Sequence, residues 1–262
     1  MKAPWQGSPR VEVLFTPADF EALGRRDLSG ATCVVFDVLR ATTTLVSALA
    51  AGAESVTPAA SISEALALKA ARPEVLLAGE RDGVRITAAV SGGVDFDLGN
   101  SPREFTPGVV RGRQIVATTT NGTRALRACA AARHVLPCCL RNVGAVALWM
   151  LAHPTPEWLV VCSGTYEDAA YEDVLGAGAL VDVLAGANPH LQLLDSARIA
   201  RLIHRDASPG LAQAMAPHAR NGRRLASVPE LAPDIAVCAT RDDLSIVAAL
   251  GPDGAVRTVG AS

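Results

Sequence analysis

Short apolar runs alternate with longer segments of helical composition along most of this chain. Runs of this length suit buried strands, and polar or glycine-containing turns separate each run from the segment that follows. The pattern predicts strands at 10–15, 31–38, 75–78, 115–117, 135–138 and 158–162. It predicts helices beginning at Pro17, over the alanine-rich segment up to Gly52, and at 65–70, 124–132, 142–151 and 171–184.

This alternation is typical of an α/β fold with helices on both faces of a sheet. We therefore expect residues 1–262 to form one α/β region, layered α/β/α, around a mainly parallel or mixed sheet. Residues 31–52 and 115–132 share a strand, a hydroxyl-rich turn and a helix, which suggests an internal repeat. Residues 185–262 are predicted to be mostly helical, interrupted at prolines, with a hairpin over 244–259.

Composition narrows the classes of function. The chain has 262 residues, of which half are apolar, and a net charge of −2, so it has no basic excess for binding nucleic acid. It contains no uninterrupted apolar run of about 18 residues and no apolar signal core at its start, so we expect neither a membrane span nor export. The six cysteines form no CxxC pair, which favours reduced thiols in a cytoplasmic protein.

Polar residues follow four of the predicted strands. These turns are residues 37–44, residues 79–81 continued by 97–104, residues 118–124, and residues 163–165 with the acidic pair at 172–173. The carboxyl ends of parallel strands meet at one edge of a sheet, where such folds bind their ligands. We therefore expect the four turns to form one site. Taken singly, each turn also fits a plain helix cap or loop.

The first turn carries the clearest chemistry. Asp37 interrupts a buried apolar run, so its carboxylate needs a partner, for which Arg40 and Mg²⁺ are the two candidates. Amides at the start of a helix, hydroxyls and a guanidinium bind phosphate oxygens, and a carboxylate binds the cation that accompanies them. The five histidines form no zinc-binding pattern, and hard carboxylate ligands favour Mg²⁺. No P-loop and no dinucleotide-binding glycine motif is found.

Five blocks resemble the 2-phosphosulfolactate phosphatase family. They are DVLRATTT (37–44), AGER (78–81), FDLGNSPREF (96–105), TTTNGTRAL (118–126) and EDVLGAGALV (172–181), in the family's order. The resemblance implies a Mg²⁺-dependent phosphatase with the family's own α/β fold. It also implies hydrolysis of (R)-2-phospho-3-sulfolactate to 3-sulfolactate and phosphate, a step towards coenzyme M.

The matching blocks imply roles for individual residues. The catalytic candidates are Asp37, Arg40, Glu80 and Arg124, and the metal-ligand candidates are Asp37, Glu80, Glu172 and Asp173. The candidates for holding the three anionic groups of the substrate are Thr42, Thr43, Arg81, Asn100, Ser101, Arg103, Thr120, Asn121, Thr123, Ser163 and Gly164.

Several alternatives stay open at this stage. The nucleophile is either water activated by one acid or the carboxylate of Asp37 itself. Asp95, Ser163 and Gly176 depart from the family pattern near the rim of the expected site, which bears on the identity of the substrate. The other candidate functions are a phosphatase for another small anionic phosphoester and a non-catalytic anion-binding protein. The expected partner is a small phosphoester, and the sequence leaves a homo-oligomer open.

Overall fold

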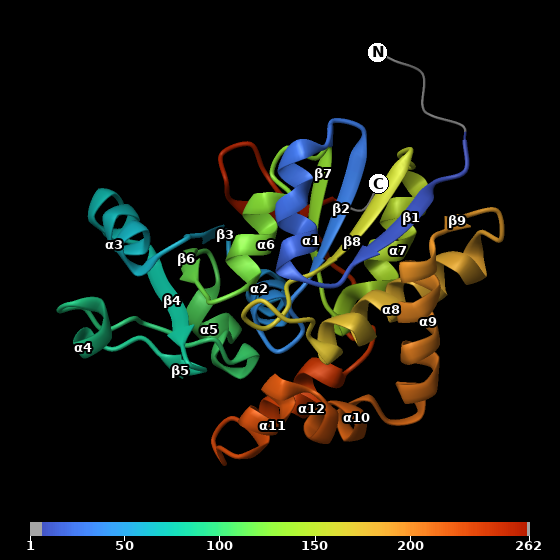
Figure 1. The fold of residues 1–262 in the computed structure, drawn as a ribbon. Helices are drawn as coiled ribbons and strands as arrows, with labels where there is room; N and C mark the ends of the chain where they lie inside the picture. Colours follow the sequence, from blue (N-terminus) through green and yellow to red (C-terminus); the bar gives the residue numbers. More distant parts are fainter. Residues whose placement is uncertain (1–6, 261–262) are drawn as a thin grey trace.

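The computed structural model describes residues 7–260, which form two β-sheets with helices between and around them (Figure 1). The first sheet is entirely parallel, with the strand order β7-β2-β8-β1-β9. Its strands are β1 (Arg10–Leu14), β2 (Ala31–Phe36), β7 (His134–Cys138), β8 (Glu157–Cys162) and β9 (Gln192–Leu193).

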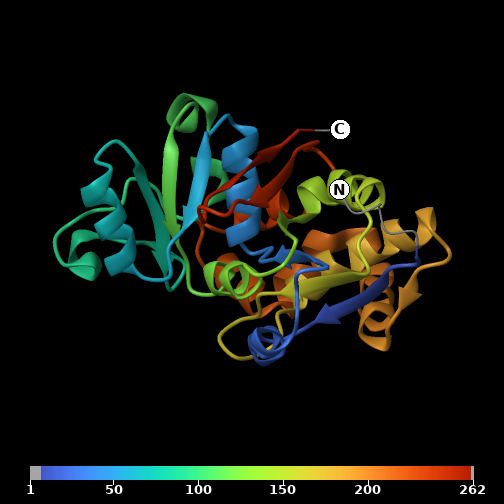
Figure 2. The same ribbon diagram turned by 90° about the horizontal axis from the view of Figure 1, so that it is seen from above.

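The second sheet is mixed, with the order β10-β11-β3-β6-β4-β5. Its three middle strands are parallel, and both edges are antiparallel. The strands are β3 (Ser55–Pro58), β4 (Leu76–Arg81), β5 (Val84–Arg85), β6 (Gln114–Thr118), β10 (Val247–Leu250) and β11 (Val256–Val259). In Figure 2 the C-terminal hairpin β10–β11 (red) lies between the two sheets. Strand β11 pairs with β3 and β10 lies beside β7, so this hairpin joins the two sheets.

Twelve α-helices lie within residues 7–260. They are α1 (Pro17–Glu21), α2 (Ala41–Ala50), α3 (Ile62–Ala71), α4 (Ala88–Ser91), α5 (Pro107–Val110), α6 (Gly122–Ala128), α7 (Val143–Ala152), α8 (Tyr171–Ala187), α9 (Asp195–Ala207), α10 (Leu211–His218), α11 (Arg220–Ala226) and α12 (Pro233–Ala239). Short 3₁₀ turns occupy Ala22–Arg25, Pro102–Glu104, Leu140–Asn142 and Ser208–Gly210. Figure 1 shows α10, α11 and α12 gathered at one end of the molecule.

The alternation of side chains along each strand divides the apolar core into layers. Val34 and Phe36 of β2 face a cluster that includes residues of α7, α8 and α9. Cys33 and Val35 face the opposite way, into a central cluster that α2 and α6 share with one face of the second sheet. The other face of the second sheet packs against α3. This arrangement confirms the predicted α/β class, with two sheets where the sequence pattern pointed to one.

Most predicted elements are present, with small shifts in their ends. Strand β4 continues to Arg81 because Glu80 and Arg81 pair with β5 across a tight turn. Strand β3 was not predicted, since its four residues end in Pro58 and give little period-two signal. Pro217, expected to interrupt a helix, lies inside α10. All six cysteines are buried and free.

The two segments of the suggested repeat lie in different sheets. Residues 31–52 supply β2 and α2, whereas residues 115–132 supply β6 and α6, and the two helices are neighbours in the central layer. The C-terminal region is largely helical and ends in the predicted hairpin. Within residues 7–260, no helix is long and apolar enough to cross a membrane.

Candidate active site

Asp37 lies directly after β2, where the chain turns into α2. Its carboxylate accepts a hydrogen bond from the backbone N–H of Ala41 at 3.0 Å and another from the backbone N–H of Gly122. The hydroxyl of Thr42 closes the turn, because it accepts from the N–H of Asp37 and donates to its carbonyl, each at 3.0 Å. These bonds fix the carboxylate at the start of α2, which is why the sequence places an acid and threonines there.

The second strand-turn-helix unit meets the first at Gly122. A Cβ atom on this residue would lie 2.7 Å from Cβ of Ala41 and 2.8 Å from Oδ2 of Asp37, closer than real Cβ contacts. Glycine is therefore required for α6 to begin against the Asp37 carboxylate. The two similar sequence segments thus bring their turns together, although their strands belong to different sheets.

Glu80, near the end of β4, ties a third segment to this place. One carboxylate oxygen accepts from both the N–H and the hydroxyl of Thr120, each at 3.0 Å. The other oxygen accepts from the N–H of Gly83 at 2.7 Å. Glu80 therefore links the β4–β5 turn to the turn that precedes α6, and its carboxylate remains at the wall of the cavity described below.

The acidic pair at the start of α8 supplies the fourth segment. Both oxygens of Asp173 accept backbone N–H bonds, from Val38 at 2.8 Å and from Gly164 at 3.1 Å. Asp173 therefore holds the ends of β2 and β8 in register. Glu172 differs, because one oxygen accepts from the side-chain amide of Asn221 at 2.6 Å and its other oxygen is buried without a partner in the described part of the chain.

Burial and mutual repulsion raise the pKa values of these acids. Burial raises the pKa of the Asp37 carboxyl to about 7, the Ala41 N–H opposes the rise, and the charges of Glu172 and Glu80 add to it. Burial also raises the pKa of Asp173 well above its usual range, with repulsion from Asp37 and Glu172, and raises the pKa of Glu172. Several acids that resist ionisation in one place mark a candidate functional site.

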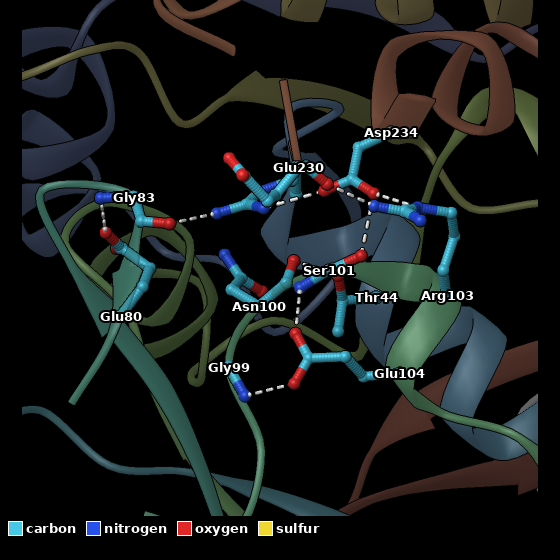
Figure 3. A network of polar contacts seen from close by, with 11 residues as sticks. Thr44, Glu80, Gly83, Gly99, Asn100, Ser101, Arg103, Glu104, Glu230 and Asp234 are labelled. Atoms are coloured by element: carbon cyan, nitrogen blue, oxygen red, sulfur yellow. Dashed lines mark hydrogen bonds and ion pairs between the residues drawn. The ribbon is translucent and has the colours of Figure 1, made fainter. Parts of the chain in front are cut away.

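Arg40 is the buried cation beside these acids. Its side chain is 3% exposed, and Nη1 lies 2.7 Å from a carboxylate oxygen of Asp234, whose side chain is fully buried. The other oxygen of Asp234 accepts from the hydroxyl of Ser101 and from Nε of Arg103, both at 2.7 Å (Figure 3). Asp234 is the second residue of α12, so the C-terminal helices hold the arginine that the β2–α2 turn provides.

A cavity of about 70 Å³ opens between these segments. Six of the residues predicted from the sequence line it: Asp37, Arg40, Glu80, Asn100, Thr120 and Asn121. The lining residues that were not among the predicted site residues are Leu39, Asp82, Gly83, Thr119, Thr165, Tyr166, Asn221, Arg224 and Leu225. Three of them, Asn221, Arg224 and Leu225, belong to α11, so the C-terminal helices cover the site.

The remaining predicted residues lie around this cavity and do not line it. Arg81 donates to the hydroxyl of Thr118 at 3.2 Å. Arg124 lies at the surface, where it pairs with Glu21 and Glu167. The others make bonds that shape the turns or lie buried beside them: Thr42, Thr43, Ser101, Arg103, Thr123, Ser163, Gly164, Glu172 and Asp173.

Comparison with known proteins places the chain in a family. The family profile described as 2-phosphosulpholactate phosphatase matches residues 19–252. The chain belongs to the 2-phosphosulfolactate phosphatase family. This membership confirms the resemblance seen in the sequence blocks and the predicted enzyme class, a phosphoric monoester hydrolase.

Curated relatives of this family align with most of the chain. A protein of Caldanaerobacter subterraneus subsp. tengcongensis is 35% identical over 249 residues, which cover 94% of this chain and 98% of the relative. A protein of Deinococcus radiodurans is 42% identical over 194 residues (73% and 78%), and one of Symbiobacterium thermophilum is 37% identical over 225 residues (84% and 91%). Each is named a probable 2-phosphosulfolactate phosphatase.

Two carboxylates of this family member fit a divalent cation. Asp37 and Glu172 interact through their charges, and one oxygen of Glu172 is a buried acceptor to which no described residue donates. Across residues 7–260, no group of three or more His, Cys, Asp or Glu side chains is arranged to hold a metal ion. Mg²⁺ commonly binds one or two carboxylates and fills its shell with waters and phosphate oxygens, so two acids suffice.

Sequence reasoning missed the residues that come from the C-terminal helices. Asp234 stands 194 positions from Arg40 in the chain. It follows a proline, and this pair of residues is typical of an ordinary helix start. Asn221 and Arg224 lie in a polar, arginine-rich helix typical of a solvated surface. Thr119 was inside a predicted turn, and its hydroxyl is buried with no partner among the described residues. Thr119 lines the cavity, so its hydroxyl is a candidate donor to a ligand there.

Proposed function

We propose that this protein is a Mg²⁺-dependent phosphatase that hydrolyses (R)-2-phospho-3-sulfolactate to 3-sulfolactate and phosphate. The observation that carries the proposal is the buried Asp37 carboxylate beside Glu80 and Glu172, at the wall of a cavity that Arg40 also lines. Acids and a guanidinium that converge in this way suit a phosphate ester with its cation. The names of the relatives supply the substrate.

Asp37 and Glu172 would hold Mg²⁺, which when bound neutralises charge that develops on the phosphoryl oxygens. The rest of the proposed chemistry belongs to the chain. Arg40 is fixed by Asp234 and by the carbonyl of Gly83, so its guanidinium is oriented before the substrate arrives. These two bonds use two of its five N–H groups, and the others can donate to phosphoryl oxygens.

In the proposed reaction a water molecule attacks phosphorus in line with the bond to the ester oxygen. That P–O bond breaks, and the electron pair stays on the sulfolactate oxygen. Asp37 takes a proton from the attacking water and later releases it to solvent, and a proton from solvent converts the leaving oxygen to the alcohol. The hydroxyl of Thr119 and the amide of Asn121 line the cavity and would orient the phosphate.

The test is phosphate release from a panel of esters. The purified protein would be assayed with 2-phospho-3-sulfolactate, 2-phospholactate, 3-phosphoglycerate and p-nitrophenyl phosphate, each with Mg²⁺ and with EDTA. We expect the largest kcat/KM for the sulfonated ester and loss of turnover in EDTA. A different preferred ester would overturn the assigned substrate, and no release from any ester would overturn the enzyme proposal. Rapid-quench mass spectrometry should detect no phosphorylated Asp37.

A further inference from the structure

Two arginines line the cavity within the described chain, Arg40 and Arg224, and they are held very differently. Both contact the tight turn between β4 and β5. Gly83 in this turn accepts from Nη2 of Arg40 at 2.7 Å, and the carbonyl of Asp82 accepts from Nη2 of Arg224. Asp82 and Gly83 both have positive φ angles, 56° and 77°, as a two-residue hairpin turn with an Asp-Gly sequence requires.

Arg40 is a fixed and largely neutralised cation. Its side chain is 3% exposed and faces the fully buried carboxylate of Asp234, whose other oxygen is bonded by Arg103, so the charge of Arg40 is opposed at close range. Removing one partner of such a buried pair is expensive, so the pair stays intact when a ligand binds. Arg40 therefore offers directed N–H groups, whereas it adds little net positive charge to the cavity.

Arg224 is the loosely held cation. It lies on α11, its side chain is 44% exposed, and its charge partner is the carboxylate of Asp82, 3.6 Å away and 79% exposed. An ion pair this open contributes little to stability and is readily exchanged for another anion. Leu225, the next residue, packs into the apolar core, so the backbone that carries Arg224 is anchored, while its guanidinium contacts the exposed residue Asp82.

More acidic than basic side chains line the cavity, so a second anionic group of a substrate needs a further cation there. Asp37, Glu80 and Asp82 are acidic lining residues, and Arg40 is already paired with Asp234. A divalent cation held by the acids can bind the phosphate, but a further anionic group on the same substrate would still meet a negatively charged wall. Arg224 is the lining side chain that can leave its exposed partner and offset that group.

We propose that Arg224 binds a second anionic group of the substrate, a sulfonate or carboxylate a few bonds from the phosphate. This inference rests on the proposed phosphatase function and specifies the substrate class of that site. Arg224 is then a specificity-determining residue, because it distinguishes phosphomonoesters that carry a further anion from those that do not. Its planar N–H pairs suit both oxyanions, which lysine would match less well.

The experiment compares wild type, Arg224→Gln and Arg205→Gln on two kinds of ester. Arg205 lies on α9, its side chain is 55% exposed and pairs with the carboxylate of Asp182, and it does not line the cavity, so its variant is a charge-matched control. For 2-phospho-3-sulfolactate and 2-phospholactate, kcat/KM of Arg224→Gln should fall 10- to 100-fold, as expected for a lost charge-assisted contact. For isopropyl phosphate, which has no second anion, it should change less than about 3-fold.

An equal loss on isopropyl phosphate, or no loss on the anionic esters, would overturn the assignment of Arg224. A binding measurement tests the role of Arg224 independently of turnover. In calorimetric titrations with 3-sulfolactate, which carries no phosphate, Arg224→Gln should weaken binding at least 10-fold and Arg205→Gln should not. Unchanged binding in Arg224→Gln would overturn the inference even if wild type hydrolyses every ester. Absence of hydrolysis by wild type would instead overturn the proposed function, and the calorimetry would still decide the role of Arg224.

Discussion

Replacing Asp37 by asparagine should stabilise the fold at alkaline pH in the absence of a divalent cation. The carboxyl is buried and lies beside other acids, and its pKa rises from 3.8 to about 7. A rise of roughly three pKa units, at 1.36 kcal/mol each, corresponds to a cost on the order of 4 kcal/mol for ionised Asp37 in the folded protein. Asparagine carries no charge, and its side-chain oxygen can still accept from the N–H of Ala41.

The sign of the pH dependence follows from linkage. The folded protein binds the Asp37 proton more tightly than the unfolded chain does, so this group favours folding most below pH 3.8. Its contribution to the free energy of unfolding falls as the pH rises from about 4 to about 7, and is constant above that. The burial-raised pKa values of Asp173 and Glu172 also lower the free energy of unfolding as the pH rises. In Asp37→Asn only these two acids contribute to that loss, so its stability should depend less on pH.

The assay is urea unfolding of both proteins in EDTA at pH 5 and pH 8. At pH 8 we expect Asp37→Asn to exceed wild type by about 1–4 kcal/mol, with the lower end allowing for one weakened hydrogen bond. Wild type should lose stability between the two pH values, and the variant should lose less. Asp206→Asn, an exposed position on α9, is the control and should follow wild type. A variant less stable than wild type at pH 8, or one with an unchanged pH slope, would refute the reasoning.

Two further substitutions test how the site is built. Asp234→Asn leaves the buried guanidinium of Arg40 without its counter-charge. The free energy of unfolding in urea should fall by about 3–5 kcal/mol. The variant should also lower kcat more than it raises KM. A KM effect alone would argue against a positioning role for Asp234. Gly122→Ala places a methyl group against Asp37 and should reduce kcat at least 10-fold with a stability loss of about 1–3 kcal/mol. Gly108→Ala, where a Cβ meets nothing within 4 Å, should leave kcat unchanged, and equal effects of the two alanines would contradict the steric argument.

The features that sequence reasoning recovered are local ones. Asp37 stands out because an acid ends a buried strand, and the threonines after it cap a helix, so both can be recognised from a few neighbouring residues. The convergence of turns was predicted from the rule that parallel strands end at one edge of a sheet. Glu80 and Asn121 come together for this reason, because β4 and β6 are parallel neighbours in the second sheet. Asp37 follows β2 of the first sheet, and it reaches them because α2 packs against α6.

The features that sequence reasoning missed depend on long-range packing. The division into two sheets is set by which strands pair, and β2 and β6 have similar patterns although they lie in different sheets. The contact between Arg40 and Asp234 joins the β2–α2 turn to α12 across nearly the whole chain. Neither residue's neighbours in the sequence indicate its partner. Arg224 likewise has the composition of a surface helix, and only the fold brings it to the cavity.

The most direct test of the central claim is the initial rate of phosphate release from 2-phospho-3-sulfolactate by wild type and by Asp37→Asn, with Mg²⁺ and matched amounts of folded protein. We expect turnover by wild type and a rate at least 1,000-fold lower for the variant, on the order expected for losing a group that acts on the reacting atoms. Because equal amounts of folded protein are compared, unfolding cannot account for such a loss. Near-normal turnover by Asp37→Asn would contradict the claim that this carboxylate is the centre of the site.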